Sequence, residues 1–163
     1  MTRGVCAPIM ATLLVVTACS GDTQPPLVAG RVRAEVTRVV DGDTIHVNLQ
    51  GRDVTIRLIG IDTPETVAPG QPVQCYGHRA SAYTTTRLDG RTVDLEFDVE
   101  RTDRYDRTLA YVWIGSELFN ETLVRGGFAL VTTYPPDVRY VERFTDAQHA
   151  ARAEGLGLWS ACS

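Results

Sequence analysis

Residues 32–60 read VRAEVTRVVDGDTIHVNLQGRDVTIRLIG, and this stretch decides the fold class of the chain. Apolar residues alternate with charged or polar ones on both sides of Asp41-Gly42, which is typical of half-buried β-strands joined by a hairpin turn. A third apolar run, residues 54–60, follows the glycine-bearing turn Gln50-Gly51-Arg52. The stretch therefore predicts three sequential antiparallel strands.

A helix and two further strands are predicted in the middle of the chain. The helical spacing of small and apolar residues predicts a helix that reaches Leu88 and is ended by Gly90. Strict alternation over residues 92–99, which places Val99 on the buried face, predicts a fourth strand. Residues 109–114 are apolar throughout and predict a fifth strand.

Serine and glycine residues mark two more helices. The first is expected over residues 117–125, capped by Ser116 and stopped by Gly126-Gly127, and the second over residues 137–154, closed by Gly155. Five mostly antiparallel strands, with one helix inserted and others following, predict an α+β fold. The expected architecture is a five-stranded barrel of the oligonucleotide-binding type.

The N-terminal residues are predicted to be an export signal. Arg3 precedes residues 5–18, an uncharged apolar run that is too short to span a bilayer as a helix. The run leads into Val16-Thr17-Ala18-Cys19, which resembles a bacterial lipobox. Acylation of Cys19 would anchor the protein to the outer side of a cell membrane or in a periplasm-like space. Plain secretion with cleavage at the same small-residue site is the alternative.

The expected organisation has three parts. Residues 1–18 form a lipoprotein signal peptide, residues 19–30 a flexible tether, and residues 31–163 one globular domain. Without the signal, 15 arginines face 20 acidic residues, since one of the 16 basic residues lies in the signal, and the net charge becomes −5. An acidic chain does not attract nucleic acid through its overall field, so any phosphate recognition must be local.

The cysteines predict one disulfide. Cys6 leaves with the signal and Cys19 accepts the lipid, so Cys75 and Cys162 remain as a pair in an oxidising compartment. Two free buried thiols are the alternative. A zinc site lacks support, because no histidine and cysteine residues stand at ligand spacing. We therefore expect His46, His78 and His149 to be surface residues.

Charged residues at the ends of the predicted strands suggest phosphodiester chemistry. Asp43 lies in the turn after the first strand and Asp62 lies at the exit of the third, so strand pairing could bring the two carboxylates together. Carboxylates this close repel each other unless a cation such as Ca²⁺ or Mg²⁺ lies between them. Glu65 could act as general base on a water molecule, and Arg57 and Arg107 could bind one phosphate.

Each of these residues also has a structural interpretation. Asp-Gly-Asp-Thr is a common turn sequence, and Thr-Pro-Glu commonly starts a loop. Arg57 could extend its head group from the barrel to solvent, and Arg107 could pair with Asp103 or Asp106 on the surface. Three carboxylates and two arginines in this order are much harder to explain as structure alone.

Five segments carry a resemblance to a known family. They are VVDGDTIHV, TIRLIGIDTPET, CYGHRASAYT, RTDRYDRTLAYVW and ETLVRGGFALV, and with them residues 31–160 resemble the staphylococcal nuclease (thermonuclease) family. The resemblance implies an oligonucleotide-binding barrel with three helices. It also implies Ca²⁺-dependent hydrolysis of DNA and RNA that leaves 3′-phosphates.

The resemblance also implies roles for individual residues. By motif position, Ca²⁺ would be held by Asp43, Asp62 and the backbone carbonyl of Thr63, and Glu65 would be the general base. Arg57 and Arg107 match the phosphate-binding arginines of the family. The nucleotide's terminal phosphate would be contacted by Arg104, which replaces a lysine, and by Tyr105.

The chain departs from the family pattern at two places. Tyr134 stands in a loop that is shorter and poorer in tyrosine than the family's base-stacking loop, so it is either a stacking residue or a helix-entry residue. Asp106 replaces a glycine and puts a negative charge beside Arg107. A monomeric nuclease is the leading hypothesis. A non-catalytic nucleic-acid-binding module of the same fold and a structural envelope lipoprotein are the alternatives.

Overall fold

The computed structural model of the chain describes Met1 and residues 26–66 and 72–162. The predicted lipid acceptor Cys19 and all of the predicted signal except Met1 lie outside the described residues. In the described part of the chain, none of the helices has the length and apolar character needed to cross a membrane.

Five long strands form the predicted barrel. They are β1 (Arg31–Val39), β2 (Thr44–Leu49), β3 (Arg52–Leu58), β5 (Thr92–Glu96) and β6 (Thr108–Ile114). The strand order is β3-β2-β1-β5-β6, all antiparallel, and a parallel pairing of β3 with β6 closes the sheet into a barrel. The α+β fold with a five-stranded barrel is therefore confirmed.

The barrel interior is apolar because the alternating residues of the strands point into it. Val36 of β1 lies opposite Val47 of β2, and Ile45 lies opposite Ile56 of β3, all with at most 1% of their surface exposed. Leu95 of β5 is fully buried in the same core. This burial is the main stabilising contribution to the fold.

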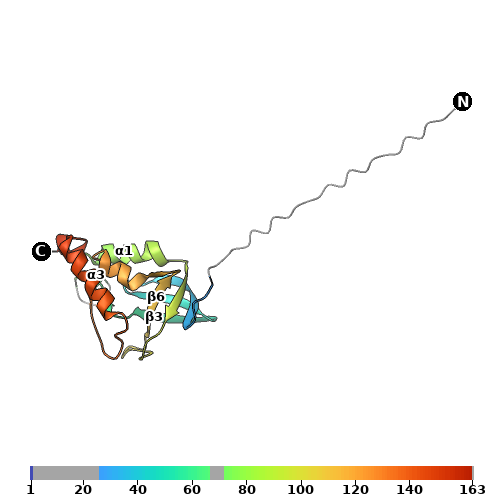
Figure 1. Cartoon of the computed structure of the whole chain (residues 1–163), viewed down its shortest axis with the longest axis horizontal. Helices are drawn as coiled ribbons and strands as arrows, with labels where there is room; N and C mark the ends of the chain where they lie inside the picture. The colour runs from blue at the N-terminus through green and yellow to red at the C-terminus, as the bar shows by residue number, and fades with distance from the viewer. Residues whose placement is uncertain (2–25, 67–71, 163) are drawn as a thin grey trace.

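Among residues 26–66 and 72–162, four helices accompany the barrel: α1 (Gly77–Leu88), α2 (Phe119–Arg125), α3 (Val141–Ala153) and the one-turn α4 (Leu158–Ala161). In Figure 1, α1 lies across the top of the strands and α3 runs along the side of the barrel. As predicted, Gly90 and Gly155 follow α1 and α3 with positive φ angles of 69° and 64°. Three helices had been expected, and α4 is an additional single turn.

The described part of the chain also contains three short strands. They are β4 (Ile61–Asp62), β7 (Glu117–Leu118) and β8 (Leu130–Val131). Strand β4 pairs with β8, so the segment that carries Asp62 is attached to the chain that leaves α2.

Three predicted boundaries are wrong. The fourth strand ends at Glu96, and Val99 is 66% exposed, because Asp98 turns to bind Tyr111 and Arg139. The second predicted helix begins at Phe119 without a cap from Ser116, because residues 117–118 pair with β6 instead. Helix α3 begins at Val141 instead of residue 137, where a buried aspartate accepts the Glu100 N–H.

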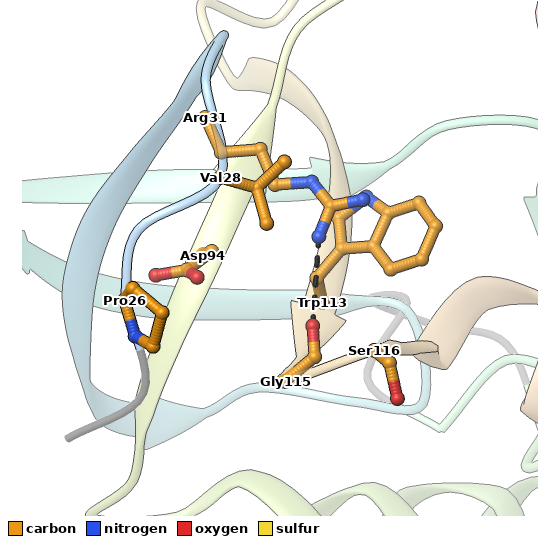
Figure 2. A pocket seen from close by; sticks show the side chains of 7 residues that line it. All are labelled: Pro26, Val28, Arg31, Asp94, Trp113, Gly115 and Ser116. Carbon is orange, nitrogen blue, oxygen red and sulfur yellow. Dashed lines mark hydrogen bonds between the residues drawn. The ribbon is translucent and has the colours of Figure 1, made fainter. Parts of the chain in front are cut away.

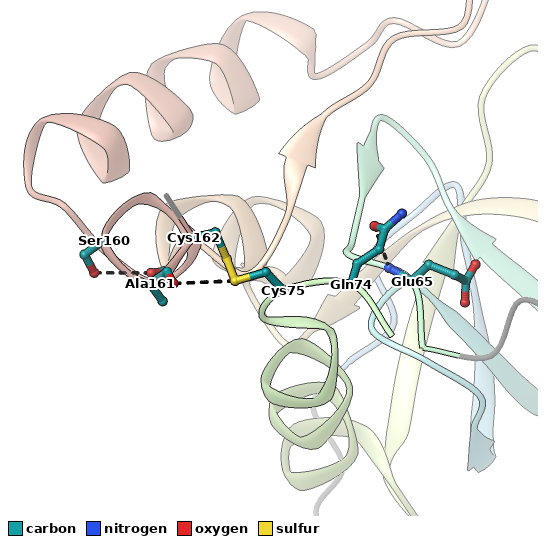
Figure 3. Close-up of a disulfide and its surroundings, with 7 residues drawn as sticks. Glu65, Gln74, Cys75, Ser160, Ala161 and Cys162 are labelled. Atoms are coloured by element: carbon teal, nitrogen blue, oxygen red, sulfur yellow. Dashed lines mark hydrogen bonds between the residues drawn. A yellow bond between two sulfur atoms is a disulfide. The ribbon is translucent and has the colours of Figure 1, made fainter. Parts of the chain in front are cut away.

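The predicted disulfide between Cys75 and Cys162 is present, with its Cα atoms 5.8 Å apart (Figure 3). It ties the chain just before α1 to the residue that follows α4. His78 and His149 are exposed as predicted, whereas His46 is partly buried between Arg38 and Asp53.

The first residue of β1 packs against a tryptophan of β6. Arg31 of β1 lies over the ring of Trp113 of β6, with 3.5 Å between the guanidinium carbon and the ring centroid. Figure 2 shows this stack in a shallow pocket beside Pro26 and Val28, with Arg31 reaching the Gly115 carbonyl. We assign this stack a structural role, because Arg31 also pairs with Glu96.

Candidate active site

The turn between β1 and β2 is packed tightly against two other elements. A Cβ atom on Gly42 would lie 2.7 Å from the side chain of Thr63, so no larger residue fits there without displacing it. From the other side, the hydroxyl of Thr84 on α1 donates to the Gly42 carbonyl at 2.7 Å. This packing holds Asp43 in a buried position, with 4% of its surface exposed.

The Asp43 carboxylate joins three parts of the chain. One oxygen accepts hydrogen bonds from the N–H and the hydroxyl of Thr63, at 2.7 and 3.0 Å. The other lies 3.2 Å from Nε of Arg57 on β3. A buried carboxylate requires such partners, because its desolvation would otherwise be costly.

Arg57 connects Asp43 to Asp62. Its Nη2 lies 2.8 Å from the Asp62 carboxylate, and its Nη1 donates to the carbonyls of Leu58 and Ile61 at 2.7 and 2.8 Å. The predicted meeting of Asp43 and Asp62 at the strand ends is thus present in the structure. A charge inside an apolar strand requires compensating partners, and Arg57 has two carboxylates besides these two carbonyls.

One acidic residue of this site was not singled out from the sequence. Burial and the neighbouring charges of Asp43 and Glu65 raise the pKa of Asp41 to about 6. Partial desolvation, followed by the same two charges, also raises the pKa of Asp62, although that side chain is 59% exposed. Four carboxylates, which we call the acidic cluster, therefore repel one another: Asp41, Asp43, Asp62 and Glu65.

Glu65 lies three residues after Asp62 and is held by the chain that precedes α1. Its N–H donates to the Gln74 side chain at 3.0 Å, and its carbonyl accepts the Gln74 N–H at 2.9 Å. Its carboxylate accepts the N–H of Thr66 at 2.8 Å. The effect of Glu65 on the pKa values of Asp41 and Asp62 places its charge in the acidic cluster.

Arg107 is bound to Asp103, one of the two surface partners expected if this arginine has a structural role. Its Nε and Nη2 both lie 2.7 Å from Oδ2 of Asp103. Partial burial alone would raise the pKa of Asp103, but the hydrogen bonds from Arg107 outweigh it and lower the pKa. Asp103 also accepts the N–H groups of Tyr105 and Arg107, so it organises the whole turn.

The same turn brings three predicted phosphate-binding residues together. The guanidinium carbons of Arg104 and Arg107 lie 4.8 and 5.4 Å from the centroid of the Tyr105 ring, which is 63% exposed. The turn precedes β6, whose first residue pairs with Ile56, the neighbour of Arg57. Strand pairing therefore brings the turn that carries Arg107 to the end of β3 that carries Arg57.

The structure also places the two residues at which the chain departs from the family pattern. Asp106 is exposed and has a left-handed φ of 59°, and Arg107 pairs with Asp103 instead of it. Tyr134 is 71% exposed and forms a bridge to Asp137 at the entry to α3. In the part of the chain that the structure describes, no hydrogen bond, ion pair or ring contact joins Tyr134 to the other predicted site residues.

The donor chemistry of the site fits a hard cation. The charges of Asp43 and Glu65 contribute to the raised pKa values of Asp41 and Asp62, and a divalent ion between these carboxylates would relieve the repulsion. Across residues 26–66 and 72–162, however, no three acidic, histidine or cysteine residues form a ready metal-binding group. Asp43 and Asp62 have Arg57 between them instead, so binding a cation requires at least the exposed Asp62 to change partners.

Comparison with known proteins gives relatives over most of the chain. A family model described as "Staphylococcal nuclease homologue" matches residues 55–161. The thermonuclease of Staphylococcus hyicus is 48% identical over 126 residues, which are 77% of this chain and 75% of that protein. The thermonuclease of Staphylococcus intermedius is 48% identical over 124 residues, or 76% and 74%.

A more distant relative is the SPbeta prophage-derived endonuclease YokF of Bacillus subtilis. It is 40% identical over 131 residues, which are 79% of this chain and 44% of that protein. The region that the family model matches includes the second half of β3, the whole of β6 and the four helices named above. With this coverage by the family model, and this identity to the thermonucleases, the chain belongs to the staphylococcal nuclease family.

Proposed function

We propose that this protein is a Ca²⁺-dependent nuclease that hydrolyses DNA and RNA and leaves 3′-phosphates. The observation that carries the proposal is Arg57 held between Asp43 and Asp62 at the strand ends, in a chain 48% identical to thermonucleases. Carboxylates for a metal, a further carboxylate for water and arginines for phosphate are the groups that phosphodiester hydrolysis requires.

Asp43, Asp62 and the Thr63 carbonyl would hold the ion. Thr63 already fixes Asp43 through two hydrogen bonds, so one ligand is preorganised. When bound, Ca²⁺ supplies positive charge to the phosphoryl oxygens and to the attacking water. Asp62 is the more exposed of the two carboxylates and is therefore the one that can turn toward an incoming ion.

Glu65 would take the proton from the attacking water. Its carboxylate belongs to the acidic cluster, and its backbone is fixed by two hydrogen bonds. A general base must be within hydrogen-bond reach of its proton, so this fixed backbone matters for the rate.

Two arginines would stabilise the charge that develops on the phosphate. Arg57 is preorganised by its contacts with two carbonyls and two carboxylates. Arg107 would exchange part of its pairing with Asp103 for a phosphate oxygen, and Arg104 and Tyr105 would contact a neighbouring phosphate. Tyr134, exposed at the entry to α3, would stack on a base.

The function is tested by incubating the purified domain with labelled DNA and RNA, with Ca²⁺ and with chelator. We expect cleavage with Ca²⁺ only, products with 3′-phosphates, and loss of turnover in Glu65→Gln. Full cleavage under chelator, or wild-type turnover in Glu65→Gln, would contradict the mechanism.

We also propose that the protein is exported and acts as a monomer anchored by a lipid on Cys19. Support comes from the lipobox-like residues 16–19 and from the Cys75–Cys162 disulfide, which suits an oxidising compartment. Mass spectrometry of the mature N-terminus should show an acylated cysteine. An unmodified N-terminus in the secreted fraction would instead establish plain secretion.

A further inference from the structure

Gln74 forms hydrogen bonds with both the backbone N–H and the backbone carbonyl of Glu65. Gln74 Oε1 accepts the Glu65 N–H at 3.0 Å, and the Gln74 N–H donates to the Glu65 carbonyl at 2.9 Å. Figure 3 shows Gln74 beside the Glu65 backbone, while the Glu65 carboxylate extends away from the disulfide. Gln74 therefore fixes the position of the Glu65 backbone, from which the Glu65 side chain extends.

Gln74 belongs to a short segment that is itself packed against Glu65. The Gly77 N–H donates to the Gln74 carbonyl at 3.0 Å, which closes a turn through Tyr76, whose φ is 70°. A Cβ atom on Gly77 would lie 2.9 Å from the Glu65 carbonyl oxygen. The start of α1 thus lies directly against the backbone that Gln74 binds.

The Cys75–Cys162 disulfide ties this segment to the helical side of the molecule. Cys75 directly follows Gln74, and Cys162 directly follows α4. Helix α4 is fastened to the end of α2, because the Leu158 N–H donates to the Gly127 carbonyl at 2.8 Å. The disulfide therefore connects α4 covalently to the residue next to Gln74, and the Leu158–Gly127 hydrogen bond connects α4 to the chain that leaves α2.

We propose that Gln74 is a positioning residue for Glu65 and that the Cys75–Cys162 disulfide keeps Gln74 in place, so that turnover depends on the oxidation state of this disulfide. The inference rests on the proposed function, in which Glu65 is the general base. Asp43, Asp62 and Arg57 are held by other contacts, so loosening Gln74 should lower kcat and leave KM and Ca²⁺ affinity unchanged. Because Cys75 is exposed, a reductant can reach the disulfide in the folded protein.

The first test compares two substitutions of Gln74 in the full mature protein. Gln74→Met keeps the length of the side chain and removes the acceptor, and kcat should fall by about threefold to tenfold, the range expected for one net hydrogen bond. Gln74→Glu keeps an acceptor oxygen and should restore most of kcat. Asn48→Ala is the matched control, since Asn48 accepts the Gly51 N–H at 2.8 Å at the opposite end of β2.

The second test combines Gln74→Met with the double substitution Cys75→Ser/Cys162→Ser. If the disulfide acts through Gln74, the two losses of kcat will be less than additive, whereas Asn48→Ala will combine additively with the loss of the disulfide. Amide hydrogen exchange at Glu65 should become faster in Gln74→Met and on reduction of the wild-type protein.

The outcomes separate this inference from the proposed function. An inactive wild-type protein would overturn the function and the inference together. An active wild-type protein with wild-type kcat in Gln74→Met, or with additive losses in the combined variant, would overturn the inference alone. Unchanged exchange at the Glu65 amide in Gln74→Met would do the same without any measurement of activity.

Discussion

Two groups of acidic side chains on this barrel lie beside arginines, and the pKa values of their carboxyl groups are shifted in opposite directions. In the acidic cluster, burial and neighbouring carboxylates raise the pKa values of Asp41 and Asp62. In a second group, which we call the Glu96 cluster, Glu96 and Asp98 meet Arg31, Arg139 and Tyr140. There burial alone would raise the pKa of Glu96, but hydrogen bonds from Arg139 and Tyr140 outweigh it and lower the pKa.

The two groups differ in the number of carboxylates that pair with or surround each guanidinium. Arg139 lies 2.6 Å from Glu96 and 3.2 Å from Asp98, and Arg31 adds a second cation at 3.4 Å from Glu96. In the acidic cluster Arg57 is the guanidinium that directly pairs with Asp43 and Asp62, beside Asp41 and Glu65. Balanced charges stabilise the fold, whereas an excess of carboxylates leaves a demand for positive charge, which a cation would meet.

The largest expected effect comes from replacing Arg57 of the acidic cluster, with one arginine of the Glu96 cluster replaced as the control. Arg57→Lys loses the planar fork that reaches two carboxylates and two carbonyls, and we expect nuclease turnover to fall by roughly 10²- to 10³-fold. Arg139→Lys is the matched control and should keep wild-type turnover while lowering stability. Steady-state kinetics at saturating Ca²⁺, with the melting temperature of each variant, will separate the two. Equal losses of turnover would erase the functional distinction between the groups.

A smaller effect, on stability, is expected from Glu96→Gln. Glu96 accepts charge-assisted hydrogen bonds and is 13% exposed, so its loss should cost about 2 kcal/mol at pH 7. Because the folded pKa is lowered, this stabilisation is present above the pKa of the unfolded chain and disappears as the pH falls through the folded pKa.

Urea denaturation at pH 7 and at pH 3 measures this dependence. The control is Glu154→Gln, whose ion pair with Arg125 is about half exposed and should change stability by less than about 0.5 kcal/mol. A cost for Glu96→Gln that is the same at both pH values would contradict the assignment of this stabilisation to ionised Glu96.

The opposite sign is expected for Asp41→Asn. The folded pKa of about 6 lies above that of the unfolded chain, so ionised Asp41 destabilises the fold increasingly as the pH rises from about 4 to about 6. Asparagine keeps the oxygen that accepts the Asp43 N–H, and we expect a gain of about 1 kcal/mol at pH 7.5 in chelator. Thermal unfolding with chelator and with Ca²⁺ measures it, and the gain should shrink when Ca²⁺ is present. A destabilised variant in chelator would contradict the repulsion.

The fold was predictable because its signals are local. The two-residue period over residues 32–60 and the glycines after the helices are visible in short windows of sequence. The predicted helix and strand boundaries are wrong where contacts with distant parts of the chain compete with the local preference for helix or strand. Residues 117–118 fit a helix start, but Leu118 lies opposite Trp113 in the sheet and is 2% exposed. Burial of the Leu118 side chain therefore favours the strand over the helix at these two residues.

The sequence predicted only part of the arrangement of the candidate site. The motifs predicted Asp43, Arg57 and Asp62, and the structure brings these three together. Asp41 and Gln74 were not predicted, because no sequence motif indicates that the Asp41 carboxylate lies near the Glu65 charge or that Gln74 binds the Glu65 backbone. The nearness of Asp41 to Asp43 in the same turn was a signal that could have identified it.

The smallest expected effect concerns Asp106, where charge and backbone conformation give different predictions. The sequence suggested that its charge weakens Arg107, but Arg107 pairs with Asp103, and Asp106 adopts a left-handed φ of 59° that glycine tolerates best. Asp106→Gly should therefore stabilise the domain by about 0.5 kcal/mol with little change in turnover, and Asp106→Asn should change neither. Equal increases in turnover for both variants would instead show that the charge acts on Arg107. In that case the excess of negative charge would extend from the acidic cluster to the turn that carries Arg107.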